Sequence, residues 1–493
     1  MGTTSNAFVR CRRYLLVALL VYAASLWFVA APHGIGYSWR ECDTQAIARN
    51  FLEDGFNPLR PRVDWRGDTD GAVECEFPLY QLMIASVMAV FGDVEWPGRV
   101  LAMLAMLMAT LSLHRLLELR SGPGGALAGA LVFLSGGHAM MLGARVMPDA
   151  LSLSLGLAGL VKFVRYLSSG NGVSLGLAMS AFALSSLQKP TALQLGLLMF
   201  AWTALLAPRR LREPRLWLGF GFVVALVGAW LLHGRSLHEE TGLTFGVVSG
   251  GDTKFPDLHH LREPTIWLQL ARTTMLYGLS VLGAIGLFAM LVRRRLDLAD
   301  VALFVTVGTG LLVSLRYSYH HHMGPHYHVY AAVAGAWCVS RAWPAQAPRW
   351  LWPAALVAVL AHGAWQLNEE RLKCEVCAAS PMIDIAASIR RLSGPTELTV
   401  VASEKTRYDP VWRRTNNFED PRLLYHAHRH GWVLPSDGFQ VTTLENLRSR
   451  GARLVCGPLA CLSAPGVAAW LAANGEQVFR QGQTVVHRLH TTE

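Results

Sequence analysis

The chain has 493 residues, of which 52% are hydrophobic and only 16% are charged, and its mean hydropathy is +0.30. The apolar residues form long runs rather than one face of amphipathic segments, which indicates a polytopic membrane protein. The formal net charge is +10, but the basic residues cluster in short loops between the apolar runs. This pattern reports membrane topology and argues against a nucleic-acid-binding surface, so no nucleic acid is expected as a partner.

The first apolar run covers residues 14–31 and follows Arg10, Arg12 and Arg13. These positive charges predict a cytoplasmic N-terminus and a following loop on the opposite side of the membrane. The end of the run resembles a signal-peptide cleavage site. Many more apolar segments follow, however, which favours a retained membrane helix.

The loop at residues 32–96 holds nine carboxylates between Glu41 and Glu76. Within it, Thr44–Glu53 gathers its apolar side chains near one face, which predicts a short helix lying along the membrane surface. Residues 77–91 are apolar but shorter than the roughly 20 residues that a crossing needs. They are predicted to form a juxtamembrane or re-entrant helix.

Eleven membrane crossings are predicted. They cover residues 14–31, 97–119, 124–142, 149–167, 173–187, 190–207, 215–233, 268–292, 299–315, 328–343 and 350–366. With this count the basic clusters between crossings fall on the cytoplasmic side, whereas counting 77–91 as a crossing would put most of them outside. The predicted fold class is thus a polytopic α-helical membrane domain over residues 1–366, in an inner (cytoplasmic) membrane.

Residues 367–493 are less apolar and are predicted to form a separate extracytoplasmic domain. Strand-like and helical stretches alternate there, which indicates a small α/β domain. The expected strands lie at 398–402, 453–456 and 484–489, and the expected helices at 382–391 and 444–450.

Three carboxylates stand at predicted helix starts on the outer side: Asp43, Glu76 and Asp149. One interpretation is that Asp43 and Asp149 cap the helices that follow them. The other is that a carboxylate at the boundary of water and lipid serves as a general base. The shared location of all three favours a role in chemistry, in addition to any capping.

Basic and aromatic residues offer contacts for an anion. Lys189 precedes Pro190 at the predicted outer end of a helical hairpin, where it either snorkels to the interface or contacts a phosphate. The tract from Arg316 to Tyr330 is rich in histidine and tyrosine and includes His326, Tyr327 and His328. It is interpreted as a rim for an anionic headgroup, with a metal site or an ordinary interfacial aromatic belt as alternatives.

Six of the eight cysteines lie as neighbours in polar regions: Cys42 and Cys75, Cys374 and Cys377, Cys456 and Cys461. On the predicted outer side of the membrane they are candidates for disulfides. A shared zinc site for the last four is an alternative, as are thiols without a role. None of these cysteines is expected to be catalytic.

The first loop carries a family resemblance. It has Asp43 soon after the first apolar run, the sequence Ala48-Arg49-Asn50-Phe51, and Glu76-Phe77-Pro78-Leu79-Tyr80 before an apolar segment. Weaker matches are Met147-Pro148-Asp149 and Gln188-Lys189-Pro190. The chain resembles the C-type membrane glycosyltransferases over roughly residues 10–340, in particular the bacterial branch related to protein O-mannosyltransferases and the lipid A aminoarabinose transferase.

The resemblance implies transfer of a sugar, with inversion, from a polyprenyl-phosphate donor to an acceptor on the outer face of the membrane. It implies that Asp43 is the base, with Glu76 and Asp149 as further acids. Arg40, Tyr80, Lys189 and the histidine-tyrosine tract would bind substrate. Family members with amino-sugar specificity often have Lys where this chain has Phe77, so that specificity is not expected.

Several alternatives stay open at this point. The acceptor could be an envelope glycan, a lipid or a protein, and membrane lipids are expected partners in any case. No cofactor is identified from the sequence, and a divalent cation assisted by Asp149 stays an alternative. A transporter or flippase of a lipid-linked or anionic solute is the rival function, but its ionisable residues would be expected near helix midpoints rather than at helix ends.

Overall fold

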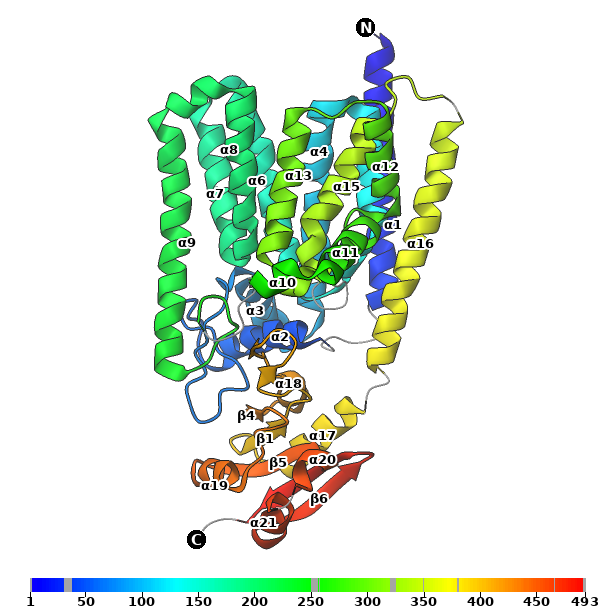
Figure 1. Cartoon of the computed structure of the whole chain (residues 1–493). Helices are drawn as coiled ribbons and strands as arrows, with labels where there is room; N and C mark the ends of the chain where they lie inside the picture. Colours follow the sequence, from blue (N-terminus) through cyan, green and yellow to red (C-terminus); the bar gives the residue numbers. More distant parts are fainter. Residues whose placement is uncertain are drawn as a thin grey trace. The chain divides into compact units, whose positions relative to one another are not determined.

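The computed structural model describes residues 2–30, 38–249, 256, 258–319, 325–348, 350–378, 381–464 and 466–490. The chain forms two compact units, which Figure 1 draws in one frame. The first unit comprises residues 1–33, 98–230 and 254–374, and the second comprises residues 34–97, 231–253 and 375–493. From residue 34 onwards, the predicted first outer loop therefore belongs to the same unit as the C-terminal residues.

The first unit is helical. Its long elements are α1 (Gly2–Ala30), α4 (Trp96–Ser135), α6 (Asp149–Ser169), α7 (Gly172–Gln188), α8 (Gln194–Leu206), α9 (Pro214–Thr241), α12 (Ser280–Val292), α13 (Leu298–Val313), α15 (Val329–Ala342) and α16 (Leu351–Ala378). Its short elements are α5 (Gly137–Ala144), η2 (Pro190–Leu193), η3 (Pro208–Arg212), α10 (Leu258–Arg262), α11 (Pro264–Thr273), η4 (Thr274–Gly278), α14 (Leu315–Ser318) and η5 (Pro325–His328). Most begin or end within a few residues of the predicted crossings.

Apolar length decides which of these helices can span a bilayer alone. In the part of the chain that the structure describes, α4, α6 and α9 are long and apolar enough. The crossing predicted at 268–292 falls on two helices, α11 and α12, which are bent by 102° at a break. A π-helical turn, η4, and Ser280, whose φ of 66° is left-handed, interrupt the helix there. The total of eleven crossings stays a prediction.

Small residues and one buried carboxylate hold helices of the first unit together. A side chain at Gly283 of α12 would meet the backbone of Gly335 in α15 at 2.7 Å, so the two helices touch through glycine. Asp300 of α13 is fully buried and accepts hydrogen bonds from the Trp337 indole (2.8 Å) and the Arg341 guanidinium (3.2 Å) of α15. A carboxylate buried in this way is stable only because both of its oxygens have donors.

The second unit begins with two helices from the first loop, α2 (Trp39–Glu53) and α3 (Leu79–Phe91). Both were expected from the sequence, and α3 has only 13 residues, which at 1.5 Å per residue is shorter than a bilayer core. The expected one-sided surface helix is wrong for α2, because every residue from Glu41 to Phe51 is buried. α3 and α18 (Arg422–Ala427) both pack against it.

The C-terminal part of the second unit contains a five-stranded mixed sheet in the order β4-β1-β5-β7-β6 (Figure 1). Its strands are β1 (Leu398–Ala402), β4 (Gly431–Leu434), β5 (Ala452–Pro458), β6 (Gly475–Gln481) and β7 (Thr484–Leu489). β1 runs parallel to β4 and β5, whereas β7 runs antiparallel to β5 and β6. The small mixed α/β sheet expected from the sequence is confirmed, with each of the three predicted strands in place.

Helices cover both faces of this sheet. Successive residues of β5 point to opposite faces of the sheet. Val455 joins a core with α19 (Val441–Ser449) and α21 (Val467–Asn474), and Leu454 joins a core with α17 (Met382–Leu392). The remaining elements are α20 (Leu459–Leu462) and a separate hairpin of β2 (Tyr408–Asp409) and β3 (Arg414–Thr415).

Candidate active site

Asp43 does not cap a helix. α2 starts four residues earlier, with Ser38 as its N-cap, and the Ser38 hydroxyl accepts a hydrogen bond from the backbone N–H of Glu41. Asp43 therefore lies inside the second turn of α2, where all backbone groups already have helical partners. Capping therefore does not explain this carboxylate, and its chemical role stays a prediction.

The Asp43 carboxylate is buried and has one identified donor, the indole N–H of Trp65, which lies 2.9 Å from its Oδ1 atom. Burial raises the pKa of Asp43 to about 8, although the Trp65 hydrogen bond and the nearby Arg40 charge both lower it. Asp64 and Asp420 add to the rise through charge repulsion. A carboxyl group with a pKa near physiological pH can both take and release a proton, as a general base requires.

Glu76 lies three residues before α3, and it pairs with Arg40 at 2.6 Å. The Glu76 side chain is 7% exposed and that of Arg40 is 21% exposed, so the pair is largely shielded from water. Arg40 and Asp43 are neighbours on one turn of α2, and this ion pair therefore ties Glu76 to the same helix. Tyr80, the predicted substrate contact on α3, is buried.

A second buried ion pair lies further along α2. Arg49 donates to the fully buried carboxylate of Asp64 at 2.6 Å, and Asn50 donates to the other oxygen of Asp64 at 3.0 Å. Arg49 also donates to the carbonyl of Tyr425 and to Nδ1 of His428, both beside α18. One arginine thus joins α2, the 57–75 loop and the C-terminal residues.

Glu74, another residue that sequence reasoning missed, binds the segment 243–249. Its carboxylate accepts hydrogen bonds from the Thr244 hydroxyl (2.6 Å), the Val248 N–H (2.6 Å) and the Ser249 N–H (3.0 Å). The backbone of Glu74 also bridges to residues 243–245 in a parallel arrangement.

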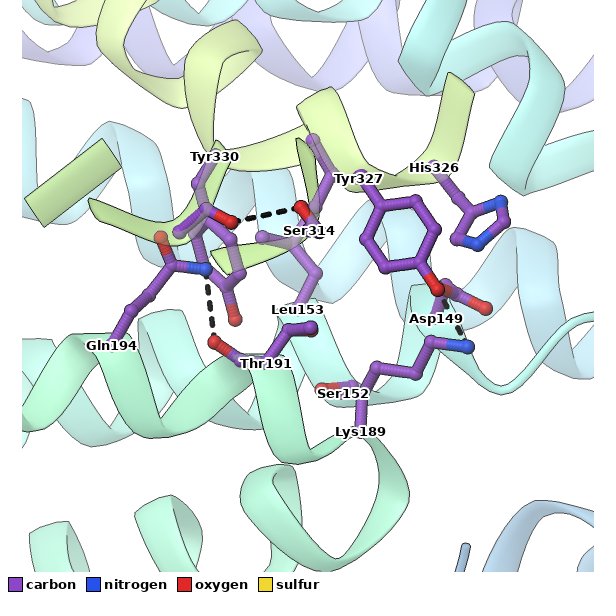
Figure 2. Close-up of a pocket in the computed structure, with 12 residues that line it drawn as sticks. Asp149, Ser152, Leu153, Lys189, Thr191, Gln194, Ser314, His326, Tyr327 and Tyr330 are labelled. Atoms are coloured by element: carbon purple, nitrogen blue, oxygen red, sulfur yellow. Dashed lines mark hydrogen bonds and ion pairs between the residues drawn. The ribbon is translucent and has the colours of Figure 1, made fainter. Parts of the chain in front are cut away.

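The first unit holds a different set of predicted residues, in a narrow pocket of about 10 Å³. Asp149, Lys189, His326 and Tyr327 all line it. Figure 2 shows the side chains of Lys189, Asp149 and Tyr327 turned towards one another, with His326 beside them. Four residues that are far apart in the sequence therefore meet, as the prediction of an anion-binding rim requires.

Asp149 is the first residue of α6 and follows Pro148, which is the N-cap residue. Its Oδ1 atom lies 3.5 Å from the Lys189 ammonium group. Its Oδ2 atom is buried and has no hydrogen-bond partner among the residues that the structure describes. A buried carboxylate oxygen without a donor is costly, which favours a ligand or a bound group at this position over a purely structural role.

The pocket is completed by residues that the sequence did not single out. They are Ser152, Leu153, Thr191, Gln194, Gly310, Ser314, Val329 and Tyr330. Ser152 and Ser185 exchange hydrogen bonds, each hydroxyl donating to the other's backbone carbonyl, at 2.9 and 2.7 Å. These two bonds fix α6 against α7 close to Asp149 and Lys189.

The histidine tract is only partly accounted for. His320, His321 and His322 lie outside the described residues. His328 does not line the pocket; it is buried, and its Nε2 atom lies 2.6 Å from the carbonyl of Ser318. The role of His328 as a substrate contact stays a prediction.

The predicted disulfides are not present at the cysteines whose side chains the structure describes. Cys75 donates a hydrogen bond to the carbonyl of Glu76, and Cys42 lies 4.0 Å from Nε2 of His426. Cys456 and Cys461 are free thiols, the first buried within β5. The side chains of Cys374 and Cys377 lie outside the described part. Sequence proximity misled the prediction, because neighbouring cysteines can point to different cores.

The free thiols predict how the protein responds to a reducing agent. We expect a reducing agent such as dithiothreitol to leave the melting temperature of the purified protein unchanged within about 1 °C, because the described cysteines form no disulfide that it could break. Loss of a disulfide would instead cost about 2–4 kcal/mol of stability. Differential scanning fluorimetry with and without the reductant measures this. A fall of several degrees, absent from a Cys456→Ser/Cys461→Ser variant, would show that this pair is oxidised in solution.

No group of three or more metal-ligating His, Cys, Asp or Glu side chains occurs among the residues for which the structure gives positions. Asp149 and His326 share the pocket in the first unit. As protein ligands alone these two fall short of the number that a closed metal site uses.

Comparisons with known proteins agree with the fold. Residues 76–233 match the sequence model of the family described as dolichyl-phosphate-mannose-protein mannosyltransferase. A comparison with curated proteins gives no match. Among solved structures, ArnT from Cupriavidus metallidurans in the apo state is similar, with a TM-score of 0.63 and 14% identity over 96% of this chain and 97% of that chain.

Two further structures show the same fold. ArnT from Cupriavidus metallidurans bound to undecaprenyl phosphate has a TM-score of 0.62, with 14% identity over 96% of this chain and 97% of that one. The archaeal oligosaccharyltransferase AglB from Archaeoglobus fulgidus, in complex with an inhibitory peptide and a dolichol-phosphate, has a TM-score of 0.56. Its identity is 11%, over 98% of this chain and 74% of that one.

The family match begins at Glu76 and includes Asp149 and Lys189, so it covers much of the predicted site. The fold extends over nearly all of the chain. An enzyme is thereby favoured over the transporter considered from the sequence. The chain is an integral membrane glycosyltransferase of the C-type fold, and its residues 76–233 are similar to the family described as dolichyl-phosphate-mannose-protein mannosyltransferase.

Proposed function

We propose that the enzyme transfers a sugar from a polyprenyl-phosphate donor to an acceptor hydroxyl, with inversion, on the outer face of an inner (cytoplasmic) membrane. The observation that carries this proposal is the Asp43 carboxylate, buried inside α2 and oriented by Trp65. The solved structures of the same fold support the donor class, because one was bound to undecaprenyl phosphate and another to a dolichol-phosphate.

In the proposed reaction Asp43 is the base. It removes the proton of the acceptor hydroxyl while the oxygen attacks the anomeric carbon, and the bond from that carbon to the phosphate oxygen of the carrier breaks. Attack from the face opposite the leaving phosphate gives inversion. Glu76, paired with Arg40, is proposed to hold that arginine in place beside Asp43.

The leaving lipid phosphate gains negative charge as the bond breaks, and cations stabilise it. Lys189, with His326 and Tyr327 beside it in the pocket of the first unit, is the proposed phosphate contact. The Lys189 ammonium group lies 3.5 Å from the Asp149 carboxylate. A phosphate with two negative charges would compete with that carboxylate for the ammonium group.

Replacing Lys189 by Met tests this assignment. We expect kcat/KM for the donor to fall about 100-fold, which is the loss typical of one charge-stabilising donor. Lys162→Met, further along α6 and outside the pocket, is the matched control and is expected to behave as wild type. Lys189→Met leaves the buried Asp149 carboxylate without this ion-pair partner, which could destabilise the fold. The Lys189→Met/Asp149→Asn double variant removes that charge as well, so a stable double variant shows that the loss of activity is not caused by unfolding. An unchanged kcat/KM for Lys189→Met would exclude the phosphate contact.

The acceptor class stays open within the proposal, and an envelope glycan, a lipid and a protein are each compatible with it. The C-terminal α/β domain is proposed to lie outside the cytoplasm, as the basic loops predict. Labelling of single-cysteine variants in intact cells tests this, since a residue such as Val411 in the exposed β2–β3 hairpin would react with an impermeant maleimide only from the outer side.

The proposed function is tested with purified protein in detergent. Radiolabelled undecaprenyl-phosphate esters of mannose, glucose, galactose, arabinose and aminoarabinose are incubated with the enzyme and a membrane-lipid extract. Consumption of one donor, with release of undecaprenyl phosphate and label in a new product, establishes donor and class together. If every donor is left intact while the same lipids move across the membrane of protein-containing vesicles, the chain is a lipid transporter instead.

A further inference from the structure

We propose that Phe245, in the segment between α9 and α10, is a positioning residue for the two acids of the first loop. Its ring contacts both of the side chains that hold Asp43 and Glu76, and Glu74 fixes the segment that carries it. This inference rests on the proposed function, because it assigns a task within the same reaction. It adds a part of the chain that lies about 200 residues from Asp43.

The first step of the argument is the contact made by the ring itself. The Trp65 and Phe245 ring centroids lie 5.9 Å apart at an interplanar angle of 37°. The guanidinium carbon of Arg40 lies 5.2 Å from the Phe245 centroid, within the range of a cation–π interaction. One aromatic ring thus packs against the donor to Asp43 and against the ion-pair partner of Glu76.

The second step concerns how the ring is kept there. Residues 243–249 form no helix or strand of their own, so the segment needs other groups to fix it. Glu74 supplies them, with three donors from Thr244, Val248 and Ser249 on its carboxylate. The N–H of Phe245 also donates to the Glu74 carbonyl at 2.9 Å. Hydrogen bonds to a buried charge are stronger than neutral ones, so this carboxylate anchors the segment.

The third step is chemical. An indole hydrogen bond and an arginine charge both favour the ionised form of Asp43. The other charged groups that act on Asp43 are Asp64 and Asp420, which favour its neutral form. If the ring is removed, Trp65 and Arg40 are less well fixed, and the balance moves towards the protonated acid. A base that is protonated at the working pH does not accept the acceptor's proton.

The test measures transfer of the radiolabelled sugar from the undecaprenyl-phosphate donor consumed in the panel above, as a function of pH. Phe245→Leu keeps apolar volume but loses the ring. We expect a fall in kcat of about tenfold at neutral pH, a change of less than about twofold in KM for the donor, and a midpoint of the pH profile roughly one unit higher. Phe245→Tyr keeps the ring and is therefore expected to show the wild-type kcat and the wild-type pH midpoint.

Two further variants sharpen the test. Glu74→Gln is expected to act in the same direction as Phe245→Leu, and the double variant to show no additional loss, because both act through one segment. Val248→Ala is the matched control: its side chain is half exposed, and only its backbone N–H bonds to Glu74. Melting temperatures of all variants show whether each remains folded.

Failure of this inference can be separated from failure of the proposed function. If Asp43→Asn abolishes transfer while Phe245→Leu has the wild-type midpoint, then Phe245 does not position the base, whatever its effect on stability. If Asp43→Asn transfers sugar normally, Asp43 is not the base, and both the proposed mechanism and the positioning role are overturned. A raised midpoint in Phe245→Leu, restored in Phe245→Tyr, supports the inference.

Discussion

Replacing Asp43 by Asn is expected to lower the rate of sugar transfer about 1,000-fold, because the amide has no basic oxygen to accept the acceptor's proton. The fold should be retained, since Asn is nearly isosteric and its amide oxygen can still accept the hydrogen bond from Trp65. Initial rates with the donor selected from the panel measure the effect. Glu53→Gln, a half-exposed carboxylate on the last turn of the same helix, is the control and should be active.

The pH dependence gives this prediction a second, independent readout. The pKa of Asp43 is raised to about 8 by burial, so the fraction in the basic carboxylate form, and with it kcat/KM, rises as pH increases through about 8. A rate that is flat between pH 6 and pH 9 would exclude Asp43 as the base.

The stability of the folded protein should fall as pH rises, whereas kcat/KM should increase. The ordinary pKa of this carboxyl group is 3.8, and the folded state holds the proton up to about pH 8. Between these values the folded protein binds more protons than the unfolded chain, so stability is lost as pH rises through this window. Asp43→Asn has no charge to bury and lacks that loss. The melting temperature of the variant relative to wild type is therefore expected to be higher at pH 9 than at pH 5.

Much of the fold could be predicted because apolar length and charge position are local properties of the sequence. The helices α6 and α7 begin and end within two residues of the predicted crossings, and β1 and β7 match their predicted bounds. The bend between α11 and α12 could not be predicted in this way, because residues 268–292 are mostly apolar, with Arg272 as the one charged residue. The break depends on a π-turn, a left-handed Ser280 and a glycine contact with α15, which are features of packing.

The charged residues of the candidate site could be predicted from the sequence, but the residues that hold them in place could not. Asp43, Glu76, Asp149 and Lys189 stood out because carboxylates and lysines are rare next to membrane segments. Trp65 and Phe245 carry no such signal, since a tryptophan or a phenylalanine is common anywhere in an apolar chain. Glu74 is one of nine carboxylates between Glu41 and Glu76, and the sequence did not set it apart from the others. The importance of these three residues comes from contacts with residues that are distant in sequence. The disulfides predicted at Cys42, Cys75, Cys456 and Cys461 are absent for the same reason, because pairing depends on geometry in space.

Loss of Arg49 is expected to cause the largest fall in stability of the single substitutions considered. Arg49→Ala leaves the Asp64 carboxylate fully buried with Asn50 as its remaining side-chain donor, and breaking a buried ion pair from one side costs about 3–5 kcal/mol. Chemical unfolding in detergent, followed by tryptophan fluorescence, measures the change. Arg60→Ala is the control: Arg60 pairs with Asp70 and Glu240 but is 29% exposed, and exposed pairs contribute about 0–1 kcal/mol.

The Arg49 substitution also separates stability from catalysis. Arg49 joins α2 to the residues around α18 through the Tyr425 carbonyl and His428, whereas Asp43 is held by Trp65. A double variant, Arg49→Met/Asp64→Leu, removes both charges together and should regain most of the stability, because two buried charges are replaced by apolar groups. If that variant is stable yet transfers sugar slowly, the link from α2 to the C-terminal residues positions Asp43 as well. If it is stable and fully active, the Arg49–Asp64 pair serves the fold alone.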